Sequence, residues 1–93
     1  MYRVYVLFDV KPDMLIKVLQ VLVHKAGVIM ADILAEQPAV LIVVQARSRR
    51  KLADLTIKAI ASVENITEGM QLMPTRYIPQ PKNKKRVVTI YNN

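Results

Sequence analysis

Residues Val40 to Val44 are five consecutive apolar residues in a chain of 93. A strand that is apolar on both faces must be covered from both sides, which places it in the centre of a sheet. Pro38 suits its beginning, because a residue without an N–H is tolerated at the start of a strand. We therefore expect a central strand over residues 39–46, with further strands beside it.

The rest of the chain alternates between strand and helix patterns. Residues 2–10 alternate with a period of two, whereas residues 14–25 and 49–62 carry apolar stripes at helical spacing. Asp13 and Ser48 are predicted N-caps, and Gly27 and Asn65 are predicted to end the helices in the left-handed conformation. The predicted strands are residues 2–10, 28–35, 39–46, 66–76 and, after a Pro- and Lys-rich segment, 87–91.

The order β-α-β-β-α-β predicts an α+β, ferredoxin-like fold with a short additional C-terminal strand. Right-handed crossovers then place both helices on one face of a four-stranded antiparallel sheet. We assign residues 1–77 to this domain and residues 78–93 to a basic linker and the last strand.

The face without helices is predicted to be apolar as well. Each strand carries apolar residues in both of its alternating sets, and an exposed patch of several hundred Å² is larger than monomers usually tolerate. Covering about 800 Å² per partner is worth on the order of 20 kcal/mol before the entropy cost of association. We therefore expect a homodimer or higher oligomer that forms through the sheet. The candidate interface residues are Tyr5, Leu7, Ile29, Ile33, Leu41 and Val43.

The segment from Tyr2 to Arg76 resembles the C-terminal effector and oligomerisation domain of the Lrp/AsnC regulators. The resemblance is carried by five stretches, which are residues 5–13 (YVLFDVKPD), 18–28, 39–46 (AVLIVVQA), 52–55 (LADL) and 57–67 (IKAIASVENIT). It implies a dimeric α/β barrel in which two sheets face each other, and a regulatory role with a small-molecule effector such as an amino acid. Since only Met1 precedes Tyr2, we expect a stand-alone effector-type domain without the helix-turn-helix. The ACT regulatory domain shares the element order, but it typically has Pro-Gly at the first turn, where this chain has Pro12-Asp13.

The turn between the second and third strands departs from the family pattern. The family usually has a Gly there and an Asp three residues later, near the effector site, and the aligned residues are Glu36 and Ala39. Arginines in the loop after the third strand could hold a ligand carboxylate with two parallel hydrogen bonds. The alternative is a plain turn and a solvated basic loop. The candidate ligand-binding residues are Glu36, Gln37, Ala39, Arg47, Arg49 and Arg50.

The net charge of +7 is concentrated near the C-terminus. Residues 76–93 carry five basic residues and no acidic one, whereas all seven acidic residues precede them. The alternative function is therefore a basic accessory protein that binds nucleic acid through the Arg47–Lys51 loop and the Lys82–Arg86 segment. Such binding would depend strongly on salt. For the effector-type module, a DNA-binding regulator is the candidate protein partner.

No enzyme activity, cofactor or metal is expected. The chain has one histidine, His24, and no cysteine, and Asp9 and Asp32 lack an accompanying nucleophile or ligand set. The longest apolar run, Ala39–Val44, is far too short to span a membrane as a helix. We accordingly expect a cytoplasmic protein without a membrane partner.

Overall fold

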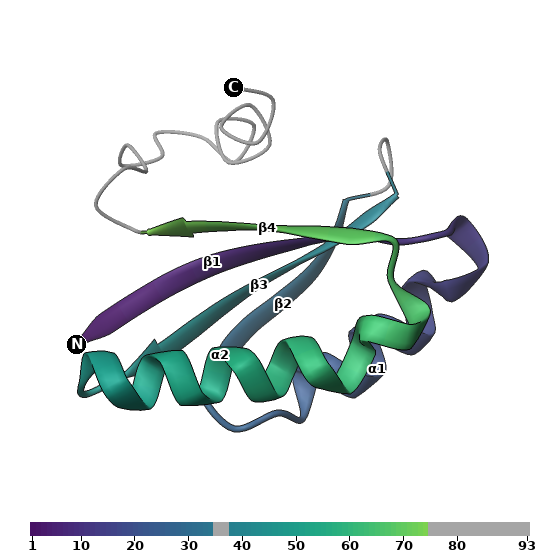
Figure 1. The fold of residues 1–93 in the computed structure, drawn as a ribbon. Helices are drawn as coiled ribbons and strands as arrows, with labels where there is room; N and C mark the ends of the chain where they lie inside the picture. Colours follow the sequence, from purple (N-terminus) through teal and green to yellow (C-terminus); the bar gives the residue numbers. More distant parts are fainter. Residues whose placement is uncertain (35–37, 75–93) are drawn as a thin grey trace.

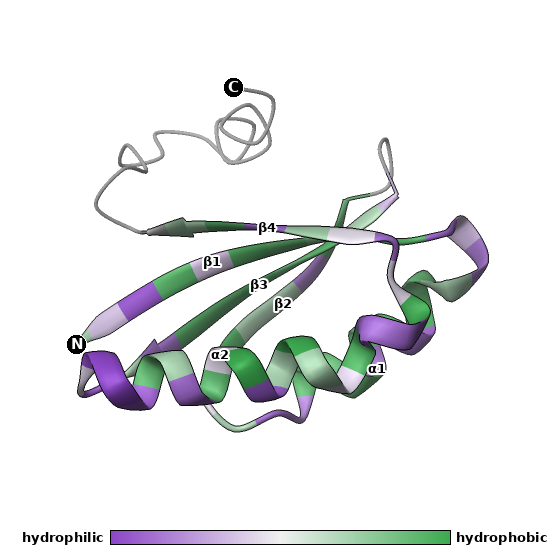
Figure 2. Ribbon diagram, in the orientation of Figure 1, coloured by the Kyte–Doolittle hydropathy of each residue, from purple (hydrophilic) through white to green (hydrophobic). Residues whose placement is uncertain are grey.

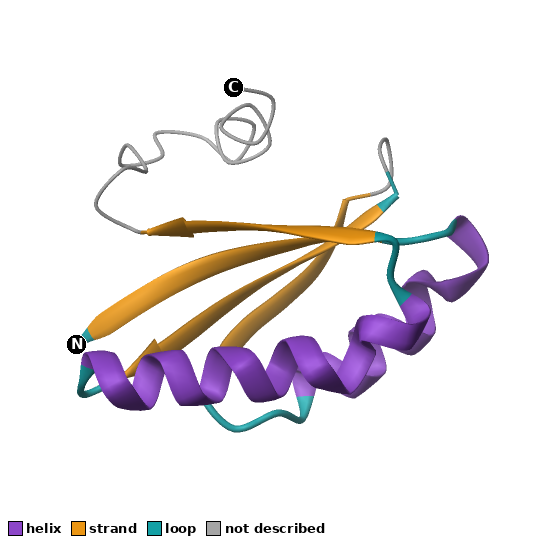
Figure 3. Ribbon diagram, viewed as in Figure 1, coloured by secondary structure: helices purple, strands orange, loops and turns teal. Residues whose placement is uncertain are grey.

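The fold is α+β and ferredoxin-like, as the sequence predicts. The computed structural model describes residues 1–34 and 38–74. One four-stranded antiparallel sheet has the strand order β2-β3-β1-β4 (Figures 1 and 3). The predicted strand over 87–91, the basic segment and the proposed boundary at residue 77 lie outside the described residues. The elements are β1 (Tyr2–Asp9), η1 (Pro12–Met14), α1 (Leu15–Val23), β2 (Val28–Leu34), β3 (Ala39–Ala46), α2 (Arg49–Val63), η2 (Glu64–Ile66) and β4 (Gly69–Pro74).

Both helices pack on the same side of the sheet (Figure 1). On this side, Val6 and Phe8 of β1 and Ile42 of β3 meet Leu22 of α1 and Val63 of α2, and all five are almost fully buried. The strands are largely hydrophobic and the helices alternate between hydrophobic and hydrophilic segments (Figure 2). No helix among the described residues is long and apolar enough to cross a membrane.

The helix ends follow the sequence signals only in part. Ser48 caps α2, because its hydroxyl accepts a hydrogen bond of 3.1 Å from the Lys51 N–H. Gly27 follows α1 with a positive φ, a conformation that favours glycine. Asp13 is not an N-cap: it lies in η1, and α1 begins at Leu15 without a side-chain cap. Asn65 does not have a left-handed conformation, since the chain passes from α2 into η2 at that point.

An irregularity in β2 shifts its alternation. Val28 pairs with Val44 and Met30 with the next residue, Val43, so Ile29 is an extra residue, as in a β-bulge. The prediction of Ile33 on the open side is therefore wrong in orientation: Ile33 packs against the helix-side core. Ile29 is exposed at the bulge. A single inserted residue reverses the faces of every residue after it.

The second side of the sheet, here called the open face, has a smaller apolar cluster of its own. Leu7, Ala39 and Leu41 form it, with Tyr5 and Leu34 packed against them. Leu7 and Leu41 are 6% and 3% exposed in the single chain, so the centre of this face is better covered than the sequence predicts. The open-face residues, assigned from the strand register, are Arg3, Tyr5, Leu7, Asp9, Met30, Asp32, Leu34, Ala39, Leu41, Val43, Gln45, Gly69, Gln71 and Met73.

Candidate functional site

Four of the residues predicted to bind a ligand are described by the structure, and they lie at opposite ends of β3. Ala39 is the first residue of β3, whereas Arg47 follows the last. An extended strand rises by about 3.3 Å per residue, so the two ends of β3 are separated by roughly 23 Å. Glu36 and Gln37 lie outside the described residues. Within one chain, Ala39 and Arg47 are therefore too far apart to contact the same small ligand.

At the turn end, Ala39 is buried and pairs with Leu34 on one side and Asp9 on the other. Its methyl group has no polar atom to offer a ligand. The chain after β1 is attached to this turn through a hydrogen bond of 3.1 Å from the Val10 N–H to the Pro38 carbonyl. Lys11, the residue after Val10, is the basic residue nearest in sequence to this hydrogen bond. The arginines of the predicted ligand site lie at the other end of β3.

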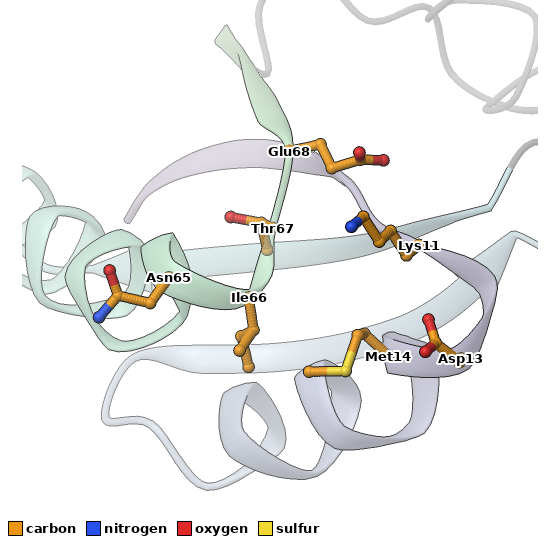
Figure 4. Close-up of a pocket in the computed structure, with 7 residues that line it drawn as sticks. All are labelled: Lys11, Asp13, Met14, Asn65, Ile66, Thr67 and Glu68. Atoms are coloured by element: carbon orange, nitrogen blue, oxygen red, sulfur yellow. The ribbon is translucent and has the colours of Figure 1, made fainter.

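A hollow of about 430 Å³ lies at the same end, between η1 and the segment that leads into β4 (Figure 4). Met14 and Ile66 are its partly buried apolar residues, and both pack against the core. The other lining residues are polar or charged: Lys11, Asp13, Asn65, Thr67 and Glu68. Among the described residues, no ion pair joins Lys11 to either of the two carboxylates of this hollow.

One backbone hydrogen bond joins the two walls of this hollow, and a second one closes the turn of η1. The Glu68 N–H donates to the Asp9 carbonyl at 2.7 Å, and the Met14 N–H donates to the Lys11 carbonyl at 2.8 Å. Lys11 and Glu68 are thereby held at adjoining strand ends, although they lie far apart in the sequence. This hollow was not predicted from the sequence. In the sequence, this hollow is indicated only by Lys11 and Asp13 on either side of Pro12. Glu68 lies far away in the sequence and reaches the hollow because β4 pairs with β1.

The opposite end of β3 is strongly basic. Arg47, Arg49, Arg50 and Lys51 are all exposed there, and the first turn of α2 contains no acidic residue. Cations are unfavourable at the positive N-terminal end of a helix, so an anion placed among them would relieve a local repulsion. The Arg49 guanidinium lies over the Tyr2 ring, with its carbon 5.5 Å from the ring centroid. This separation is within the range of a cation–π contact.

A second hollow of about 510 Å³ adjoins this basic end and is lined by Ser48, Arg50, Lys51 and Asp54. Asp54 is engaged with Lys58, one helical turn later, at 3.6 Å. The structure thus brings Arg50 into a hollow, as a ligand contact requires, and leaves Arg47 outside the residues that line it. Asp9 and Asp32 do not face each other, because they pair with Ala39 and Leu41 and β3 separates their strands.

The candidate interface residues are distributed over several environments. Tyr5, Leu7, Leu41 and Val43 share the open face, and Leu7, Leu41 and Val43 are buried within the single chain. Met30, which the sequence pattern did not single out, is the open-face residue opposite Val43 and is 42% exposed. It was missed because the irregularity at Ile29 cannot be read from alternation alone.

No protein-family model matches the chain, and no curated protein matches its sequence. Solved structures do share its fold. A protein from Thermus thermophilus, TTHA0845, has a TM-score of 0.67 at 15% identity, over 80% of this chain and 91% of that one. A transcriptional regulatory protein of the AsnC family from Pyrococcus furiosus has a TM-score of 0.66 at 18% identity, over 96% of this chain and 58% of that one. This chain therefore spans little more than half of the length of that regulator.

A third structure carries a different description. A "putative antibiotic biosynthesis monooxygenase" from Nitrosomonas europaea has a TM-score of 0.58 at 13% identity, over 80% of this chain and 95% of that one. At these identities the likeness concerns the fold alone. The chain therefore has the α+β, ferredoxin-like fold that is found both in an AsnC-family regulator and in a protein of that enzymatic description.

Proposed function

We propose that this chain is a non-enzymatic regulatory module that self-associates through the open face and binds a small charged effector where two copies meet. The observation that carries the proposal is the apolar character of the open face, where Met30 is 42% exposed and Tyr5 and Met73 are partly buried around the buried cluster of Leu7, Ala39 and Leu41. The fold shared with an AsnC-family regulator is consistent with this role. The effector class is a free amino acid or a similar small molecule with a carboxylate.

The separation of the predicted ligand residues supports a site between subunits. Arg49 and Arg50 of one copy supply cations, and the Ala39 end of β3 in the other copy supplies the second wall. A ligand held by both copies stabilises the assembled state in proportion to its preference for that state. Effector binding and assembly are then linked, which is how such a module would transmit a signal to a partner regulator.

The non-enzymatic part of the proposal rests on where the groups with catalytic potential lie. His24, the one histidine of the chain, is exposed immediately after α1 and lines neither of the two hollows. The larger hollow carries Arg50, Lys51 and Asp54, which suit the binding of an anion better than proton transfer at neutral pH.

The direct test is a thermal-shift and calorimetric screen with individual free amino acids. A ligand that raises the melting temperature of the wild-type chain should lose at least about tenfold in affinity in an Arg49→Ala/Arg50→Ala variant, since removing a charge-assisted hydrogen bond costs about 1.5–3 kcal/mol. Lys17→Ala, an exposed lysine on α1, is the matched control and should leave the affinity unchanged. No shift with any amino acid would overturn the proposed effector class.

Nucleic-acid binding is the second candidate function, and the exposed cluster Arg47–Lys51 favours it. Titration with duplex DNA and single-stranded RNA at about 50 mM and about 200 mM salt separates the two functions, because phosphate contacts weaken steeply over that range. Salt-sensitive binding to either polymer, together with no response to amino acids, would replace the effector proposal with this one.

A further inference from the structure

Basic residues from three parts of the chain meet at one end of the sheet. Arg3 of β1 pairs with Gln45 of β3, so the start of β1 lies beside the end of β3, from which the chain passes into α2. The Gln45 N–H donates a hydrogen bond of 2.8 Å to the Gly27 carbonyl, which holds the turn after α1 at the same end. The basic end therefore comprises six residues, of which all but the half-buried Lys25 are exposed: Arg3, Lys25, Arg47, Arg49, Arg50 and Lys51.

Carboxylates are scarce at the basic end. Asp54, in the second turn of α2, is the nearest among the described residues, and its Oδ2 is 3.6 Å from the Lys58 Nζ. Asp32 pairs with Leu41, five residues before the end of β3, which is a separation of roughly 16 Å along the strand. The other described acidic residues lie beyond the far ends of β1 and α2 or at them: Asp9, Asp13, Glu64 and Glu68. Six cations thus share one carboxylate that already contacts another lysine, and such a concentration of one sign attracts a polyanion.

The basic end also presents an aromatic ring. Tyr2 is 42% exposed, and the Arg49 guanidinium carbon lies 5.5 Å from its ring centroid, where the start of the chain runs beside the beginning of α2 (Figure 1). A base of a single strand can stack on an aromatic ring or on a guanidinium plane, whereas the bases of a duplex are already stacked on each other. Cations combined with a stacking surface are typical of sites for single-stranded nucleic acid.

The cations flank the start of β1 on both sides of the sheet. Arg3 lies on the open face, and its Nε donates a hydrogen bond to the Gln45 Oε1, which leaves the terminal guanidinium nitrogens available. Tyr2 pairs with Ala46, a member of the helix-side core, so its ring and Arg49 lie on the other side. A strand of nucleic acid that crosses this end therefore meets cations on both sides and the ring between them.

We infer that the basic end binds single-stranded nucleic acid, with phosphates on its cations and a base stacked on Tyr2. This inference rests on the second candidate function proposed above and extends it from the loop to a surface that includes Arg3, Lys25 and Tyr2. It requires neither self-association nor an amino-acid effector, because all of these residues belong to one chain. None of the contacts distinguishes ribose from deoxyribose, so RNA and DNA single strands should bind alike.

The stacking part is tested by fluorescence-anisotropy titration of the full chain with labelled oligonucleotides of about 12 nucleotides, over a salt series. The probes are a single strand of RNA, a single strand of DNA and a DNA duplex of the same length. Tyr2→Ala should weaken the binding of both single strands by at least about fivefold and leave the salt dependence unchanged, because it removes stacking but no charge. Tyr2→Phe keeps the ring and should bind as the wild type does.

The phosphate part is tested in the same titrations by the slope of log affinity against log salt concentration. Arg3→Gln should reduce the magnitude of this slope by about 0.7, which corresponds to one phosphate contact on a single strand. Lys17→Gln, an exposed lysine on α1 outside the basic end, is the matched control and should leave the slope unchanged. Circular dichroism melts identify any variant that loses the fold, and Arg47→Gln replaces Arg3→Gln if the latter does so.

The outcomes separate this inference from the candidate function on which it rests. If none of the three probes shows salt-sensitive binding, nucleic-acid binding itself is overturned. If binding is salt-sensitive but the duplex binds as tightly as the single strands, or Tyr2→Ala binds as tightly as Tyr2→Phe, only the assignment to single strands is overturned. A slope that Arg3→Gln leaves unchanged would contradict the extension of the surface beyond the loop.

Discussion

The two sides of the sheet bury apolar side chains by different means. The helix side is closed by α1 and α2, which seal Val6, Phe8 and Ile42 into a continuous core. The open face has only the small cluster around Leu7 and Leu41, with Met30 partly in solvent. The comparison indicates that the helix side supplies most of the folding free energy, whereas the proposed self-association would use the open face.

The largest difference between the two sides should appear when a large side chain is removed from each. Phe8 and Tyr5 belong to the same strand and point to opposite faces. Phe8→Ala should lower the free energy of unfolding by about 3–5 kcal/mol, because it leaves a cavity in a closed core. Tyr5→Ala should lower it by about 1 kcal/mol, which is typical of a partly buried site. Urea unfolding at one protein concentration measures both, and equal losses would contradict the distinction.

The two glycines offer a second comparison. Gly27 has a positive φ, and a Cβ there would lie 2.6 Å from the Leu55 Cδ1. Gly27→Ala should therefore destabilise the chain by about 2 kcal/mol or more, from backbone strain and overpacking together. Gly69, on the open face, has only the Asp9 Oδ2 at 3.4 Å from such a Cβ. Gly69→Ala should accordingly cost less than about 1 kcal/mol. Thermal melts give the order, and a larger loss for Gly69→Ala would refute this account of the α1–β2 connection.

The cap of α2 contributes less. Ser48→Ala removes the hydrogen bond to the Lys51 N–H and should reduce stability by about 1 kcal/mol. Ser48→Asp keeps an acceptor and adds a negative charge among four basic residues, so it should be at least as stable as the wild type. Destabilisation by Ser48→Asp would show that the repulsion inferred at this end of α2 is not significant.

Substitution of Met30 and of Met70 should have the smallest effect on stability. The two substitutions should nevertheless differ clearly in their effect on dimerisation. Met30 and Met70 have nearly equal exposure, 42% and 41%, but Met30 lies on the open face while Met70 pairs with Phe8 on the helix side. Met30→Lys and Met70→Lys should each change stability by less than about 0.5 kcal/mol, as surface substitutions usually do. Only Met30→Lys should weaken dimerisation, as measured by light scattering. Similar weakening by Met70→Lys would point to the β4 edge instead.

The sequence predicted the fold because its signals are local and repeated. The apolar run of β3, the alternation of β1 and the cap at Ser48 each agree with the structure. The errors arise where one residue changes the geometry, as at Ile29, which moves Ile33 to the helix side. The beginning of β4 was also predicted too early, because η2 continues to Ile66 before the strand begins at Gly69.

The candidate site was harder to predict, because it depends on which strand ends lie together. Arg47–Arg50 and Ala39 belong to opposite ends of β3. The predicted strand over residues 39–46 already implied this separation, but the list of candidate residues did not take it into account. The hollow between Lys11 and Glu68 requires the pairing of β1 with β4, a contact between residues far apart in the chain.

Sedimentation equilibrium of the wild-type chain, from low micromolar to near-millimolar concentration, tests the role of the open face most directly. We expect a reversible transition to a particle of twice the chain mass of 10.6 kDa. A single species of 10.6 kDa over the whole range would contradict the assembly proposed for this face.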